Sequence, residues 1–129
     1  MRERLILLID DEADLRDAVA TALRTEGLTV EVAADGAEAV RSARALEPAV
    51  IVVDLGLPRI DGWDVIRNLR RTSARFRPHI IVMSGFADAR SRQLAFEAGC
   101  DEYIVKTVGV LGLVRAVQAR LTRAWSASV

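Results

Sequence analysis

Residues 49–54 read Ala-Val-Ile-Val-Val-Asp, an uninterrupted apolar run that ends in a carboxylate. Residues 5–11 follow the same pattern as Leu-Ile-Leu-Leu-Ile-Asp-Asp, so three acids close two apolar runs. In an open parallel sheet, ligands bind beyond the carboxyl ends of the strands. Three carboxylates meeting there without a cation would repel one another and force at least one to take up a proton. The pattern therefore predicts a divalent metal site formed by Asp10, Asp11 and Asp54.

The composition indicates one globular domain. The chain has 129 residues, of which 51% are hydrophobic, and both values suit a single folded unit. Its 18 basic residues balance 18 acidic ones, so no overall charge attracts nucleic acid or an anionic membrane. The first apolar run is too short for a signal peptide or a membrane span, and we expect a cytoplasmic protein. Cys100, the single cysteine, is expected to be a small packing residue.

Apolar runs rich in β-branched residues alternate with segments of helical periodicity, as in βαβ units. We expect strands at residues 4–9, 28–33, 50–53, 79–83 and 101–105. The second alternates apolar and polar residues, which is typical of an edge strand. The first helix is predicted from an apolar stripe of Leu15, Ala18, Val19, Ala22 and Leu23, with Gly27 just past its end. Further helices are predicted at residues 36–46, 62–72 and 88–98, and a last one carries Val110, Val114, Val117 and Leu121 on one side.

Right-handed crossovers and short connections allow few topologies for five such units. We predict an α/β fold with a doubly wound, five-stranded parallel sheet in the order 2-1-3-4-5, covered by helices on both faces as a three-layer sandwich. The switch point of that order lies between the first and third strands, whose ends carry Asp10, Asp11 and Asp54. Residues 1–123 are assigned to one domain and residues 124–129 to a short C-terminal tail.

Two more polar residues follow apolar strands. Ser84 comes after Ile-Ile-Val-Met, and Lys106 comes after Tyr-Ile-Val. A hydroxyl, an ammonium and three carboxylates around Mg²⁺ suit a phosphoryl group, with one carboxylate as the nucleophile. Each residue alone has an ordinary explanation, such as a helix cap, a surface charge or a turn. Their joint occurrence at strand ends is what indicates the site.

Four stretches carry a resemblance to a known family: residues 7–12 (LLIDDE), 52–58 (VVDLGLP), 83–85 (MSG) and 98–106 (AGCDEYIVK). They resemble the receiver domain of two-component response regulators, a flavodoxin-like (βα)5 fold, over residues 5–123. The resemblance implies that Asp54 is the phosphoacceptor. It implies that Asp10, Asp11, Asp54 and the backbone carbonyl of Gly56 bind Mg²⁺ or Mn²⁺. It also implies that Ser84 and Lys106 contact the phosphoryl oxygens, and that Ser84 and Tyr103 form the switch.

The resemblance further implies a signalling switch that catalyses only its own phosphorylation and dephosphorylation, rather than a turnover enzyme. The phosphoryl group would come from a sensor histidine kinase or a phosphotransfer protein. An unidentified downstream protein would then recognise the changed surface. We expect no direct contact with nucleic acid or membrane, and either a monomer or a phosphorylation-dependent dimer.

One position departs from the family pattern. Thr107 follows Lys106 where most members have proline, so a cis bond there would be costly and we expect a trans bond. The rearranged loop would then put the place of Lys106 in doubt. This departure leaves open a receiver-like interaction module that is independent of phosphorylation. A small Mg²⁺-dependent aspartyl phosphohydrolase is a further alternative, although Asp54 lacks a second acid two residues later.

Two other features invite functional interpretations. His79, the only histidine, begins a strand at the edge opposite the acidic residues, and we expect neither a phosphohistidine nor a metal role for it. Five arginines lie on and after one predicted helix: Arg67, Arg70, Arg71, Arg75 and Arg77. We interpret them as a solvated helix face rather than a nucleic-acid site.

Overall fold

The computed structural model describes residues 2–55, 60–72 and 75–128, and they contain a five-stranded parallel sheet. Its strands are β1 (Arg2–Ile9), β2 (Thr29–Ala33), β3 (Pro48–Leu55), β4 (His79–Ser84) and β5 (Glu102–Val105). The order across the sheet is β2-β1-β3-β4-β5, which confirms the predicted topology and places β2 at an edge. Ile9 pairs with Val53, so the carboxyl ends of β1 and β3 lie side by side.

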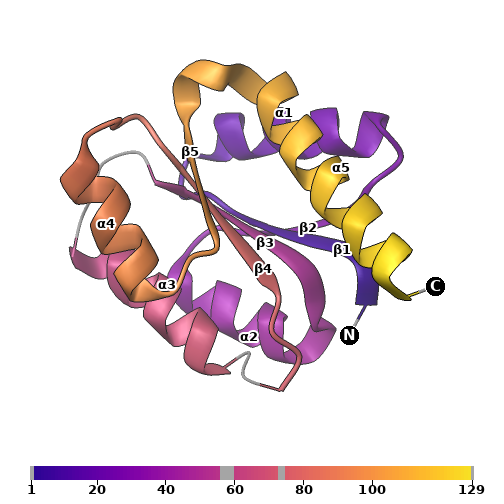
Figure 1. The fold of residues 1–129 in the computed structure, drawn as a ribbon, viewed down its shortest axis with the longest axis horizontal. Coiled ribbons are helices and arrows are strands. Elements are labelled where there is room, and N and C mark those ends of the chain that lie inside the picture. The colour runs from indigo at the N-terminus through magenta and orange to yellow at the C-terminus, as the bar shows by residue number, and fades with distance from the viewer. Residues whose placement is uncertain (1, 56–59, 73–74, 129) are drawn as a thin grey trace.

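The helices lie on both faces of the sheet. They are α1 (Ala13–Thr25), α2 (Gly36–Leu46), α3 (Ile60–Thr72), α4 (Ala89–Ala98) and α5 (Gly109–Ser128), with a 3-10 turn, η1 (Lys106–Val108), before α5. Helices α1 and α5 cover one face, and α2, α3 and α4 cover the other (Figure 1). Within the described ranges, no helix is both long enough and apolar enough to span a bilayer.

Two hydrophobic cores follow from this three-layer arrangement, because successive side chains of a strand point to opposite faces of the sheet. Ile6 of β1 packs in the core with Leu113 of α5. The next residue, Leu7, packs in the other core with Ile66 of α3. Burial on both faces explains the uninterrupted apolar runs of β1 and β3, and it fixes the register of the strands that end at the acidic residues.

The prediction for α1 was wrong at one position of its apolar stripe. The fully buried side chains are Val19, Ala20 and Leu23, whereas Ala18 is exposed. Alanine is too small to show which way a helix faces, so the larger Val19 and Leu23 set the buried side. The end of the helix agrees with the prediction, since Gly27 adopts a φ of 82°, in the left-handed region that favours glycine.

Candidate functional site

The carboxyl edge of the sheet brings two buried acids together. Asp54 lies within β3 and is 6% exposed, and Asp10 directly follows β1 and is 3% exposed. Because β1 and β3 pair side by side, the two carboxyl groups are neighbours. Asp11, by contrast, is exposed, and Gly56, whose carbonyl is a predicted metal ligand, lies outside the described residues.

Lys106 supplies the positive charge that faces Asp54. Its Nζ lies 2.5 Å from Asp54 Oδ1, and it is the first residue of η1, directly after β5. The described chain contains no cis peptide bond, so the bond between Lys106 and Thr107 is trans, as predicted. The lysine has nevertheless kept its place beside Asp54, so the absence of proline at position 107 has not displaced it.

Asp10 is poorly solvated for a charged group. The pKa of its carboxyl is raised to about 6 from an ordinary value of 3.8, mainly by burial and also by the nearby Asp54. The hydrogen bond from the Glu12 amide to Asp10 Oδ1, at 2.9 Å, and the Lys106 ammonium both act to lower it. In the metal-free protein, the Glu12 hydrogen bond and the Lys106 charge therefore offset only part of the cost of burying ionised Asp10.

The atoms present at this edge fit a hard divalent cation. Asp10 Oδ2 is buried and has no hydrogen-bond partner, and Mg²⁺ prefers carboxylate and carbonyl oxygens. Within the described residues, however, no group of three or more acidic, His or Cys side chains is arranged to hold a metal. The structure thus brings Asp10 to Asp54, and the participation of Asp11 and Gly56 remains a prediction.

The predicted switch residues both contact the main chain of Phe86. Ser84 is fully buried at the end of β4, and its Oγ accepts a hydrogen bond from the Phe86 amide at 3.1 Å. The hydroxyl of Tyr103, on β5, donates to the Phe86 carbonyl at 2.6 Å. Tyr103 is itself buried, so its side chain already lies inward here. A short segment after β4 therefore links the two residues.

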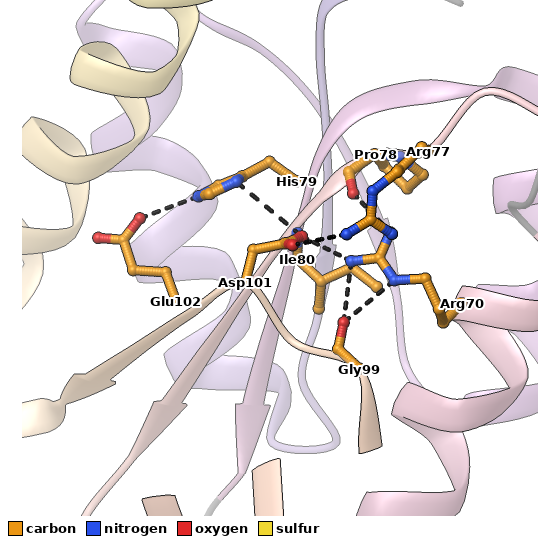
Figure 2. A network of polar contacts seen from close by, with 8 residues as sticks. All are labelled: Arg70, Arg77, Pro78, His79, Ile80, Gly99, Asp101 and Glu102. Carbon is orange, nitrogen blue, oxygen red and sulfur yellow. Dashed lines mark hydrogen bonds and ion pairs between the residues drawn. The ribbon is translucent and has the colours of Figure 1, made fainter. Parts of the chain in front are cut away.

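The opposite edge of the sheet holds an ionic network around Asp101 (Figure 2). Asp101 Oδ2 accepts hydrogen bonds from Arg70 at 2.5 Å and from the Ile80 amide at 2.8 Å, and Oδ1 contacts Arg77. His79 pairs with Glu102 at 2.9 Å through Nε2. His79 thus pairs with Glu102 at the edge of the sheet opposite to Asp10 and Asp54.

The interpretation of the five arginines as a solvated helix face was wrong for Arg70. Its side chain is only 18% exposed. Besides Asp101, its guanidinium donates to the carbonyls of Gly99 and Pro78 at distances between 2.9 and 3.1 Å. Arg70 therefore fastens α3 to the chain segments before β4 and β5. Arg67, on the exposed side of the helix, agrees with the interpretation.

Comparison with known proteins identifies the class to which this fold and site belong. The family model described as "Response regulator receiver domain" matches residues 6–118. The chain therefore belongs to this family and is a receiver domain of two-component signalling.

Named relatives agree with this assignment. The chain is 38% identical over 123 residues to the "DNA-binding response regulator MtrA" of Mycolicibacterium paratuberculosis, covering 95% of this chain and 53% of MtrA. It is 36% identical over 118 residues to the "Transcriptional regulatory protein PrrA" of Mycobacterium bovis, covering 92% of this chain and 50% of PrrA. The chain thus spans about half the length of these relatives.

Solved structures share the fold. A signal receiver domain from Bermanella marisrubri is 31% identical, with a TM-score of 0.79 over 92% of this chain and 98% of its own. A response regulator from Burkholderia pseudomallei is 26% identical, with a TM-score of 0.77 over 98% of this chain and 73% of its own. The latter contains a phosphorylated aspartic acid and a calcium ion.

Proposed function

We propose that this receiver domain accepts a phosphoryl group on Asp54 in a metal-dependent reaction. The observation that carries the proposal is the buried Asp54 carboxylate, which lies 2.5 Å from the Lys106 ammonium and beside the buried Asp10. A carboxylate is a competent nucleophile when the charge that develops on the transferred group is neutralised by fixed cations. Lys106 supplies one such cation.

The transfer is a displacement at phosphorus. An oxygen of Asp54 forms the new P–O bond while the P–N bond of a donor phosphohistidine breaks, and the leaving imidazole nitrogen keeps the bonding electron pair. The donor would be a sensor histidine kinase or a phosphotransfer protein. Lys106 would contact the phosphoryl oxygens, and the Ser84 hydroxyl would exchange its bond with the Phe86 amide for one with the phosphoryl group.

The metal would be held by Asp10, Asp11, Asp54 and the Gly56 carbonyl. The buried Oδ2 of Asp10 supports this assignment, since that oxygen has no hydrogen-bond donor. Mg²⁺ or Mn²⁺, when bound, would supply the second positive charge for the phosphoryl oxygens.

The output would pass through the segment that links Ser84 and Tyr103. Movement of Ser84 toward a phosphoryl group changes its contact with Phe86, whose carbonyl accepts the Tyr103 hydroxyl. The surface formed by α4, β5 and α5 would change, and a cytoplasmic partner or a second copy of the chain would recognise it. The relative MtrA is described as a DNA-binding response regulator. For this domain itself we propose a readout through protein contacts.

Intact-protein mass spectrometry after incubation with acetyl phosphate and Mg²⁺ tests the proposal. We expect one phosphoryl adduct on the wild type and none on Asp54→Asn. Asp35→Asn is the matched control, because Asp35 follows β2 at the same edge and its side chain caps α2 through the Glu38 amide, which Asn can also do. Continuous release of phosphate without an adduct that outlasts removal of acetyl phosphate would favour a phosphohydrolase instead. Neither an adduct nor release of phosphate would favour a phosphorylation-independent interaction module.

A further inference from the structure

Some buried polar side-chain atoms of the described residues lack a hydrogen bond. Among the side chains that the structure describes, three N or O atoms are buried without a hydrogen bond: Asp10 Oδ2, Asp54 Oδ1 and Arg16 Nε. Such atoms are uncommon in folded proteins. The two carboxylate oxygens belong to the site above, and Asp54 Oδ1 has the Lys106 ammonium as its ion-pair partner. Arg16 is the remaining member, and the proposed reaction gives it no role.

Arg16 contacts the main chain of Asp10. It lies on α1, and its Nη1 donates to the Asp10 carbonyl oxygen at 3.0 Å. That carbonyl belongs to the peptide unit that joins Asp10 to Asp11. The hydrogen bond from Arg16 therefore sets the orientation of the covalent link between two predicted metal ligands.

The other polar groups of Asp10 are also held. Its amide donates to the Ala33 carbonyl of β2 at 3.1 Å, and its Oδ1 accepts from the Glu12 amide at 2.9 Å. Since Arg16 holds the carbonyl, Oδ2 is the one oxygen of Asp10 without a hydrogen bond, and it is therefore the atom that can bind a cation. Because Asp10 lies past the last residue of β1, neighbouring strands no longer constrain its carbonyl, and Arg16 takes over that function.

We infer that Arg16 is a positioning residue of the metal site, which holds the Asp10–Asp11 peptide so that Asp10 presents Oδ2 to the cation. This inference rests on the proposed function, since it requires a metal at Asp10. Groups that orient a metal ligand through hydrogen bonds often change metal affinity when they are replaced, although they do not touch the metal. Arg16 is such a group, and its partner is a backbone carbonyl.

Isothermal titration of the chelator-treated full chain with Mg²⁺ tests the inference. Arg16→Met should weaken Mg²⁺ binding by about tenfold, the lower end of the effect for groups that orient a ligand. Arg16→Lys keeps one donor and should bind with intermediate affinity. Without metal, the Glu12 amide of Arg16→Met should exchange its hydrogen faster than that of the wild type. The reason is that Asp10 Oδ1, which accepts the hydrogen bond of this amide, is no longer held in place.

Arg24→Met is the matched control. Arg24 also lies on α1 and donates through Nη2 to a strand carbonyl, that of Val30, at 2.7 Å, but at the end of the helix away from Asp10. Its replacement should lower the melting temperature without changing the Mg²⁺ affinity. A purely structural role for Arg16 would make the two variants behave alike.

Unchanged Mg²⁺ affinity in folded Arg16→Met would overturn the inference and leave the proposed function intact. If Arg16→Met does not fold, Arg16→Gln, whose side chain is too short to reach the carbonyl, carries the same expectation and the same refutation. Failure of the wild type to bind Mg²⁺ would instead overturn the metal site of the proposed function, and the inference with it.

Discussion

Replacing Asp10 with Asn should stabilise the metal-free protein near neutral pH. Asp10 is 3% exposed, and burial raises its pKa to about 6 from 3.8. At 1.36 kcal/mol for each pKa unit, keeping this group ionised in the folded state costs about 3 kcal/mol. Asn removes the charge and keeps an oxygen for the Glu12 amide. The amide group is still polar and buried, so part of the desolvation cost remains and we expect a net gain of about 1 to 3 kcal/mol.

The gain should depend on pH in a defined direction. Because the folded-state pKa is raised, protonation of Asp10 favours the folded wild type. The advantage of Asp10→Asn should therefore be full above the folded value of about 6 and shrink as the pH falls toward 3.8. Urea unfolding with chelator, at a series of pH values, measures the difference. Asp11→Asn is the control, since Asp11 is exposed and its change should move the unfolding free energy by less than about 0.5 kcal/mol.

An equal effect of Asp10→Asn and Asp11→Asn would refute this reasoning, as would a gain for Asp10→Asn that is independent of pH. Either result would mean that the charge of Asp10 is not the unfavourable one. With saturating Mg²⁺ the wild type should instead have a higher free energy of unfolding than Asp10→Asn. The reason is that only the wild type keeps its full set of metal ligands, and metal binding stabilises the folded state.

The remaining predictions concern positions outside the acidic pair. Arg70→Met should lower the free energy of unfolding by about 2 to 4 kcal/mol, because it removes the partly buried guanidinium that donates to Asp101 and to the carbonyls of Gly99 and Pro78. Arg67→Met, on the exposed face, is the control and should change it by less than about 0.5 kcal/mol. Burial raises the pKa of Cys100 to about 11, so iodoacetamide should alkylate the folded protein at least about tenfold more slowly than the urea-unfolded chain, and equal rates would contradict this. Proline disfavours a helical conformation in the residue before it, so Thr107→Pro should shift Lys106 out of its 3-10 turn and slow phosphorylation by acetyl phosphate, whereas Thr107→Ala should not. Equal phosphorylation rates in those two variants would show that the turn does not hold the lysine.

The sheet of this protein could be predicted from its sequence because large apolar residues determine where the strands lie. Strand β3 is apolar from Pro48 to Val53, and a short β-branched run of this kind is typical of a strand buried on both faces. The predicted topology then placed Asp54 and Lys106 at one edge, and the structure joins them. Ala18 was assigned to the wrong face of α1 because a methyl group adds little to a hydrophobic stripe.

Contacts to main-chain atoms could not be predicted in the same way. Arg70 donates to the carbonyls of Gly99 and Pro78, and Arg16 donates to the carbonyl of Asp10. Every residue has a carbonyl, so no residue type in the sequence marks these acceptors, and only the fold selects them. Long, flexible arginine side chains can serve a solvated surface or a buried carbonyl equally well.

Direct location of the phosphoryl group tests the central claim most sharply. The wild-type protein should be treated with acetyl phosphate, reduced with borohydride to convert any acyl phosphate to an alcohol, and digested for peptide mass mapping. We predict that reduction marks Asp54 alone, and only when Mg²⁺ is present. Reductive marking of Asp10 or Asp11, or equal marking of Asp54 in the presence of chelator, would contradict the account.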